Sequence, residues 1–490
     1  MSTFVLLLLL CLTTNACADR SARYHPTPVA FIGRNTTGTR GKSSANDVIE
    51  RNSREYASKA GRCERTASAL FNSVDTSASG SPLPVGVESV KVLPDDFPRR
   101  EDAVEAIKAV RKACMVTMRL QPNHSPTRTK DKDGTISTLT KEQADNSPVT
   151  VGDFAAQAIV LGHLSQAFPT DRFIAEESSE HLTGNPGLLK EVFEAANDHM
   201  SSSEELCRYI DLGQSYNVVD GTIEQGQTDR IWTCDPIDGT KGFIRGKLDG
   251  GQYAVCLAKL ENGVPTIGVL GCPNLPCDVD STDYEWAEGE TEANNRKSRG
   301  CIFVASKGGG CYQLPLFPDG SIQGPLKATP NDGSSTKVAD ARFCCGVESG
   351  FGDYLGQQAR IAKILHGPSA LDDKGEIINA RRMDSQAKHG VLARGGAEIF
   401  VRLPKPGYVE WIWDHAAGFV VIEEAGGRLT DIDGQRIDFS LGAKLSPTVR
   451  GVAMTPGGVF HERLLSAFKE QEMALLGEGE EGEGGVAVVA

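Results

Sequence analysis

The sequence lacks several features, and each absence excludes a class of protein. None of its 13 cysteines forms a CxxC pair or a Cys/His spacing typical of zinc sites, and we expect mostly reduced thiols. Basic residues are outnumbered, 51 against 65 acidic residues, and the net charge of −14 argues against non-specific binding to nucleic acids or anionic membranes. The sequence has no internal repeat and no apolar run long enough to cross a bilayer.

The first residues resemble targeting signals rather than parts of a fold. The apolar stretch Phe4 to Leu12, followed by Ala16-Cys17-Ala18, predicts a signal peptide over residues 1–18. The polar segment 19–98 begins with a stretch rich in Ser, Thr, Arg and Gly that has the composition of an organelle transit peptide. A signal followed by such a segment resembles the two-part plastid presequence of algae with secondary plastids. The alternative is a secreted or lumenal protein.

The folded body is predicted to begin near Arg99 and to end near residue 473. Residues 474–490 are rich in Gly and Glu, cannot bury apolar surface and are expected to be disordered. The length between these limits suits one large domain or two fused subdomains.

Helical and strand patterns alternate in this body. Apolar residues recur at spacings of three and four over 104–118 and 154–168, and Thr150 with Asp153 approximates a capping box before the second helix. Asn262-Gly263 predicts the turn of a hairpin. We expect strands at 172–175, 231–234, 252–260, 264–270 and 398–403, and a helix at 416–425. This mixture favours an α/β layered sandwich over a doubly wound parallel sheet.

Four carboxylates stand at the ends of these elements: Glu176, Asp235, Asp238 and Asp414. Acids that meet at one edge of a sheet repel one another unless a cation lies between them. Oxygen ligands without histidine or thiolate select magnesium or manganese. Two such metals are a known device for phosphoryl transfer, because they activate water and neutralise the leaving oxygen. The alternative is that each acid caps a helix or closes a turn.

Longer segments resemble a known family. EES at 176–178, DPIDGTKGFIRG at 235–246 and WDHAAGFVVIEEAGG at 413–427 resemble the signature segments of the lithium-sensitive, magnesium-dependent phosphatases that include inositol monophosphatase. DNSPVTVGDFAAQ at 145–157 and MDSQAKHG at 383–390 are similar to the 3'(2'),5'-bisphosphate nucleotidase branch. The resemblance implies a mixed α/β fold, a layered α-β-α-β-α sandwich of two fused subdomains. The first, 99–275, would bind metals and the second, 276–473, the nucleotide.

The resemblance also implies a set of site residues. Two or three Mg²⁺ ions, with Mn²⁺ as a substitute and Li⁺ as an inhibitor, would be held by Glu176, Asp235, Asp238, Asp414 and the carbonyl of Ile237. The residues that position and deprotonate the attacking water would be Asp153, Thr240 and Glu176. The residues that bind the substrate would be Lys241, Ser385, Lys388, Arg402 and Asp414. In the alternative interpretation, Lys388 and Arg402 are ordinary surface cations and Ser385 caps a turn.

The function implied is hydrolysis of the 3'-phosphate of 3'-phosphoadenosine 5'-phosphate, or of its 5'-phosphosulfate relative, by a monomer. Lys241 favours a highly phosphorylated substrate, whereas Phe351 departs from the family pattern at the base side of the site. The alternative in the same class is an inositol polyphosphate 1-phosphatase or a related sugar phosphatase. Other classes are a nucleotide-binding sensor or a calcium-binding scaffold, since residues 131–142 imitate an EF-hand loop without its glycine. No nucleic acid partner is expected, and no membrane partner after removal of the presequence.

Overall fold

The computed structural model describes residues 93–124, 141–142, 148–214, 229–289, 292–317, 326–330, 337–347 and 356–480. The predicted signal peptide, residues 19–92 of the presequence, most of the EF-hand-like segment, Phe351 and the last ten residues lie outside this part, so the targeting, the calcium interpretation and the base-side contact stay predictions. The end of the expected presequence, 93–98, is described, and its Leu93 and Phe97 are buried in the core. No helix in the described part combines the length and apolar character needed to span a bilayer.

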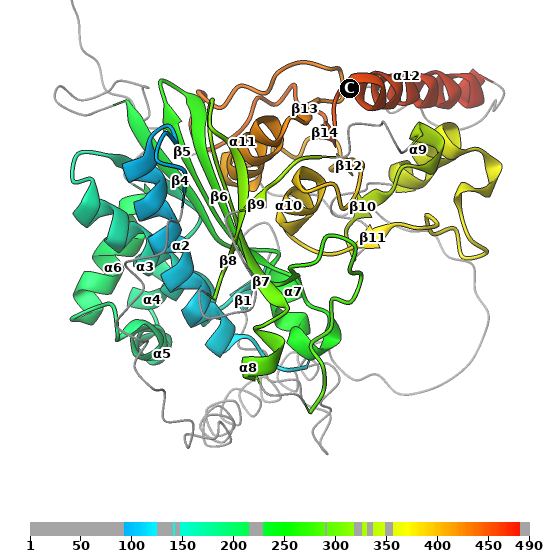
Figure 1. Ribbon diagram of the computed structural model, residues 1–490. Helices are drawn as coiled ribbons and strands as arrows, with labels where there is room; N and C mark the ends of the chain where they lie inside the picture. Colours follow the sequence, from blue (N-terminus) through cyan, green and yellow to red (C-terminus); the bar gives the residue numbers. More distant parts are fainter. Residues whose placement is uncertain are drawn as a thin grey trace, which may run out of the picture. The chain divides into compact units, whose positions relative to one another are not determined.

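Two main sheets organise the described residues (Figure 1). The larger sheet has the strand order β3-β4-β5-β6-β7-β8-β9, and the smaller has the order β11-β10-β12-β14-β13. The strands of the larger sheet are β3 (Arg172–Ala175), β4 (Arg230–Asp238), β5 (Ala254–Glu261), β6 (Val264–Pro276), β7 (Arg299–Ser306), β8 (Gly310–Pro315) and β9 (Leu326–Lys327). Those of the smaller are β10 (Phe343–Cys345), β11 (Arg381–Arg382), β12 (Ile399–Arg402), β13 (Arg428–Asp431) and β14 (Val452–Thr455). A separate pair joins β1 (Lys141–Glu142) and β2 (Pro148–Val149).

Helices form the other three layers. The outer face of the larger sheet is covered by α2 (Arg100–Leu120) and α3 (Val151–Ala167), the space between the sheets by α10 (Ala387–Ala393) and α11 (Ala416–Ala425), and the far face of the smaller sheet by α9 (Gln357–His366) and α12 (Gly458–Glu480). The remaining helices are α4 (Glu180–Thr183), α5 (Pro186–Ala196), α6 (Ser203–Asp211), α7 (Thr240–Arg245) and α8 (Glu292–Asn295). This order confirms the expected α-β-α-β-α sandwich.

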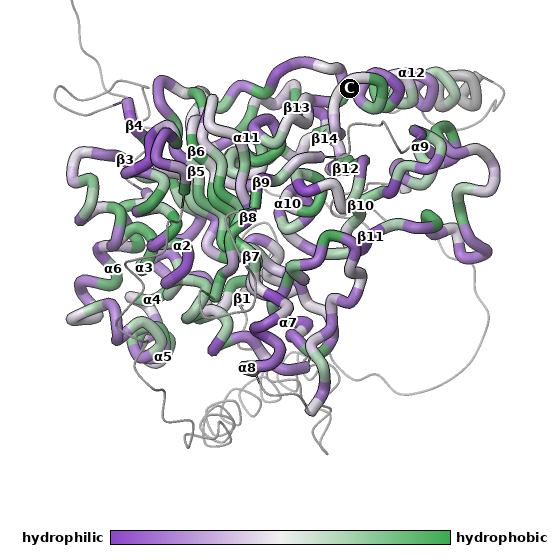
Figure 2. Tube along the Cα trace, in the orientation of Figure 1, coloured by the Kyte–Doolittle hydropathy of each residue, from purple (hydrophilic) through white to green (hydrophobic). Residues whose placement is uncertain are grey.

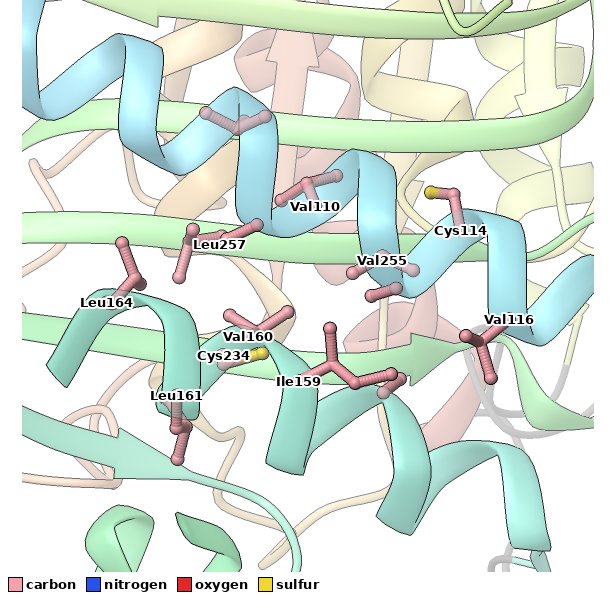
Figure 3. Close-up of a cluster of buried hydrophobic side chains, with 14 of the residues drawn as sticks. Val110, Cys114, Val116, Ile159, Val160, Leu161, Leu164, Cys234, Val255 and Leu257 are labelled. Carbon is pink, nitrogen blue, oxygen red and sulfur yellow. The ribbon is translucent and has the colours of Figure 1, made fainter. Parts of the chain in front are cut away.

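Three large apolar cores lie between the layers: one between α2, α3 and the larger sheet, one around α10 and α11 between the two sheets, and one between the smaller sheet, α9 and α12. Between α2, α3 and the larger sheet, Val110 and Val160 point toward Val255 and Leu257 of β5 (Figure 3). The central strands are mainly hydrophobic in colour, whereas α8 is hydrophilic (Figure 2). Burial of each aliphatic side chain contributes roughly 1.5–3 kcal/mol, so these cores hold the layers together.

Local expectations from the sequence are confirmed at several elements. Thr150 forms the capping box with Asp153 at the start of α3. Asn262 and Gly263 both have positive φ, 52° and 72°, as a two-residue hairpin turn between β5 and β6 requires. The larger sheet continues beyond residue 276 through β7 to β9, so the expected division into 99–275 and 276–473 runs within one sheet and stays a prediction. The cysteines of the described part are free thiols, as expected.

Candidate active site

The parallel pairing of β3 and β4 brings the first two acids together. The register sets Ala175 opposite Cys234, and the next residues of the two strands are Glu176 and Asp235. Parallel strands end at the same edge of a sheet, so both carboxylates lie at one edge. Asp235 is 3% exposed, and Glu176 is half-buried.

A break in the ladder brings Asp238 to the same edge. The register of β4 against β5 shifts between Asp235 and Asp238, as expected of a strand that contains Pro236. The backbone N–H of Gln386, next to α10, donates to Asp238 Oδ2 at 2.5 Å. This bond joins the larger sheet to the helical layer between the sheets.

Asp414 completes the group from a third direction. It ends the 3₁₀ helix Ile412–Asp414, directly before α11. One oxygen from each of Asp235, Asp238 and Asp414 lies within 4.8 Å of the others. Together with Glu176, whose pKa responds to Asp235 and Asp414, these residues form what we call the acidic cluster. The structure therefore brings together the four carboxylates that the sequence singled out.

The electrostatics of the acidic cluster fit a cation. Burial, followed by repulsion from neighbouring acids, raises the pKa of Glu176 and of Asp235. Burial also raises the pKa of Asp238, although Lys388 and Arg402 oppose that rise. Asp235 Oδ1 has no hydrogen-bond partner among the described residues. Buried oxygens that repel one another and lack donors are the arrangement that a hard divalent ion stabilises.

Asp153 and Thr240 lie beside the acidic cluster. Asp153, on the first turn of α3, accepts bonds from the backbone N–H and the hydroxyl of Thr150 at 2.7 and 2.6 Å, and burial raises its pKa to about 7. The Asp153 charge contributes to the raised pKa of Glu176. Thr240 begins α7, and its hydroxyl donates to the carbonyl of Ile237 at 3.1 Å. A carbonyl oxygen has two lone pairs, so Ile237 retains one for another ligand.

Two of the expected substrate-binding residues, Lys388 and Arg402, lie next to the acidic cluster. Lys388 Nζ donates to the carbonyl of Met383 at 3.2 Å, and its charge acts on Asp238. Arg402 donates through Nε to Glu410, and its Nη2 lies 3.6 Å from Asp414 Oδ2. Both cations therefore adjoin the acidic cluster rather than open surface.

Ser385 lies on the loop directly before α10, the helix that carries Lys388, whereas Lys241 lies on α7. Ser385 has a φ of 69°, and its hydroxyl accepts from the N–H of Ala387 at 3.1 Å. This bond caps the turn, which is the role that the sequence offered as the alternative to substrate binding. A Cβ on Gly239 would approach the Cβ of Ser385 to 2.8 Å, so the two loops are in close contact. Lys241 is exposed on α7.

Three positioning side chains were missed from the sequence. Gln157 Nε2 donates to the carbonyl of Glu177 at 2.7 Å, and its Oε1 accepts from the Glu177 N–H at 2.9 Å, which fixes the backbone next to Glu176. Gln386 uses its amide to bind the Trp413 carbonyl and the N–H of Gly418. Glu410 is buried beside Arg402. A glutamine one helical turn after Asp153 was a usable signal for Gln157, whereas Gln386 and Glu410 carry no spacing that points to the site.

Comparisons with known proteins agree with this geometry. A model of the inositol monophosphatase family matches residues 100–473. A 3'(2'),5'-bisphosphate nucleotidase of Schizosaccharomyces pombe is 39% identical over 334 residues, which cover 67% of this chain and 85% of that protein. A 3'(2'),5'-bisphosphate nucleotidase of Emericella nidulans is 37% identical, covering 69% of this chain and 90% of its own, and the 3',5'-bisphosphate nucleotidase AHL of Arabidopsis thaliana is 34% identical, covering 67% and 87%. The chain therefore belongs to the inositol monophosphatase family, together with these nucleotidases.

Proposed function

We propose that this chain is a magnesium-dependent 3'(2'),5'-bisphosphate nucleotidase. It hydrolyses the 3'-phosphate of 3'-phosphoadenosine 5'-phosphate to give AMP and inorganic phosphate, and it acts in the same way on the 5'-phosphosulfate relative. The observation that carries the proposal is the acidic cluster, assembled from the larger sheet and the helical layer and bordered by Lys388 and Arg402. The nucleotidase relatives support the choice of substrate.

The acidic cluster and the Ile237 carbonyl are the residues that would hold the magnesium ions. Carboxylate and carbonyl oxygens suit magnesium and manganese, and a bound ion of this type lowers the pKa of water and neutralises charge on ester oxygens. The family is generally metal dependent. The proposal includes magnesium as the bound ion and lithium as an inhibitor.

Asp153 and Thr240 have the chemistry to position the attacking water. Asp153 has a pKa near 7 because of burial, so the carboxylate can accept a proton close to neutral pH. Its two bonds from Thr150 hold its orientation at the start of α3. Thr240 is oriented by its bond to Ile237. Attack in line with the leaving oxygen requires no covalent intermediate on the protein.

Two cations beside the acidic cluster favour a substrate with a second phosphate. One phosphate would lie among the carboxylates that hold the metal, whereas a second phosphate needs hydrogen-bond donors outside the acidic cluster. Lys388 and Arg402 carry such donors at the border of the cluster, and Lys241 is exposed nearby on α7. A guanidinium fork matches phosphate oxygens, and this supports a bisphosphate over a monophosphate.

Phosphate release from three substrates tests the proposal: 3'-phosphoadenosine 5'-phosphate, inositol 1,4-bisphosphate and inositol 1-phosphate, each with magnesium, with EDTA and with added lithium. We expect the nucleotide to have the highest kcat/KM, no turnover in EDTA, and inhibition by lithium. Preference for either inositol phosphate would replace the proposed substrate by that of the sugar phosphatase alternative. Turnover of Asp235→Asn at the wild-type rate would show that the acidic cluster does not carry the chemistry.

A further inference from the structure

Glu410 lies outside every motif of the sequence but is buried at the site. Its side chain is 1% exposed, on the segment between β12 and the 3₁₀ helix that carries Asp414. Its carboxylate accepts from Arg402 Nε, with distances of 2.9 Å to Oε1 and 2.7 Å to Oε2. His415 Nε2 lies 2.8 Å from Glu410 Oε2. Glu410 is therefore bound both to Arg402 and to His415, the residue that follows Asp414.

Glu410 differs from the acidic cluster in its electrostatics. It lies close enough to Asp414 and His415 for the three to share an ion. However, burial alone would raise the pKa of Glu410, and the nearby Arg402 charge and the contact with His415 instead lower it to about 2. A carboxylate that already has a cation and bonded oxygens needs no metal. The main effect of Glu410 is therefore on the position of Arg402.

The bond between Glu410 and Arg402 determines which edge of the guanidinium group can bind a ligand. Glu410 occupies Nε, and Nη2 lies toward Asp414, 3.6 Å from Oδ2. Of the two partners, Glu410 is 1% exposed and Arg402 is 23% exposed. The exposed part of this ion pair therefore belongs to Arg402, and the Nη side of its guanidinium is the side that Glu410 does not bond. An arginine held at Nε loses less side-chain entropy when it binds an oxyanion.

We propose that Glu410 is a positioning residue that orients Arg402 to bind the 5'-phosphate of the nucleotide, and that it thereby sets the preference for bisphosphates. The inference rests on the proposed function, because that function assigns the second phosphate to Arg402. It goes beyond that function in placing the selectivity of the site on a residue that lies three positions before the WDHAAG segment and would touch neither phosphate.

Glu410→Gln tests the inference with two substrates that differ only in the 5'-phosphate. These are 3'-phosphoadenosine 5'-phosphate and adenosine 3'-phosphate, assayed on the full chain with saturating magnesium. We expect KM for the bisphosphate to rise about tenfold or more, since charge-assisted bonds to phosphate weaken when the arginine is misplaced. We expect kcat for the bisphosphate and kcat/KM for adenosine 3'-phosphate to change less than about twofold.

The chain offers a matched control at the other end of the same strand. Glu398 is fully buried just before β12 and accepts from Arg342 Nη2 at 2.7 Å, whereas Arg402 ends β12. Glu398→Gln removes a buried Glu–Arg pair of the same kind without touching Arg402. It should lower the melting temperature but leave the ratio of the two kcat/KM values unchanged.

Calorimetric binding of AMP to the magnesium-loaded protein gives a readout independent of turnover. AMP retains the 5'-phosphate, and Glu410→Gln should bind it about tenfold more weakly than the wild type. Unchanged AMP affinity, or equal losses on both substrates, would overturn the inference. A wild type that hydrolyses neither nucleotide would sink the proposed function, and the AMP comparison would still decide the role of Glu410. If Glu410→Gln does not fold, Glu410→Asp supplies the same measurement, because its shorter carboxylate keeps the charge but not the reach to Nε.

Discussion

Replacing Asp235 by asparagine should stabilise the metal-free protein while removing its response to magnesium. The oxygens of Asp235, Asp238 and Asp414 lie within 4.8 Å of one another. At that separation and an effective dielectric constant of about 20, two unit charges repel by about 3 kcal/mol. Asp235 faces two such neighbours, and burial together with their repulsion raises its pKa, so the charged form of Asp235 is disfavoured in the folded protein. We therefore expect the free energy of unfolding in EDTA to rise by about 1–3 kcal/mol.

Magnesium should reverse this order of stability. At a free concentration about 100 times the dissociation constant, binding to the folded state adds about 2.7 kcal/mol to the wild type. Asp235→Asn loses a ligand oxygen and should gain much less, and it should lose most phosphatase activity. Urea unfolding followed by circular dichroism, in EDTA and in a magnesium series, measures both effects.

Asp171→Asn is the matched control for this experiment. Asp171 is buried directly before β3 and accepts from Arg230 Nε at 2.8 Å and from Trp232 Nε1 at 2.9 Å, so its carboxylate has donors instead of repelling neighbours. Its replacement should lower the free energy of unfolding by about 1–3 kcal/mol and leave the magnesium increment intact. The reasoning is refuted if Asp235→Asn behaves like this control, losing stability in EDTA and keeping the gain from magnesium.

Three further outcomes are expected. Burial holds the pKa of Asp414 near 6, above its unfolded value of about 3.9, so between these pH values the folded state retains a proton that the unfolded state releases. The free energy of unfolding in EDTA should therefore fall by about 3 kcal/mol between pH 4 and 7, and a rise over this range would contradict the argument. Gln157→Leu breaks both bonds to the Glu177 backbone, and should cost about 2–4 kcal/mol and weaken magnesium binding by calorimetry, whereas unchanged affinity would make it purely structural. Gly242→Ala places a Cβ 2.0 Å from a backbone oxygen and should lower the free energy of unfolding, measured thermally, by about 3 kcal/mol or more. The control Gly308→Ala, whose Cβ would have no atom within 4 Å, should lower it by about 1 kcal/mol, and equal losses would refute the packing argument.

The sequence was informative where local chemistry decides the structure. The capping box at Thr150, the Asn262-Gly263 turn and the strand at 172–175 depend on neighbours along the chain, and all three are confirmed. The acids at the strand ends were found for the same reason. Their meeting in space is a property of the sheet register; their positions at element ends suggested it, and the resemblance to a family supported it.

Residues that act through tertiary contacts left no such signal. Glu410 follows a stretch of prolines and a glycine, where a carboxylate is ordinary, and its importance depends on β12 bringing Arg402 to the same place. Gln386 likewise gains its role from three partners on other segments, among them Asp238 and Gly418. Periodicity and spacing report contacts within an element, so they cannot identify side chains whose partners come from a different layer.

The acidic cluster also explains why its cations lie where they do. Glu176 and Asp235 come from the larger sheet, whereas Arg402 comes from the smaller sheet and Lys388 from the helix between them. Without an ion, repulsion inside the cluster is offset in part by these two cations, as their opposing effects on the pKa of Asp238 indicate. The ligand oxygens come from the larger sheet and from the segment that precedes α11, so an ion in the cluster links the larger sheet to the helical layer. Binding of a divalent ion should therefore stabilise the contact between the layers, in addition to supplying the chemistry of phosphate release.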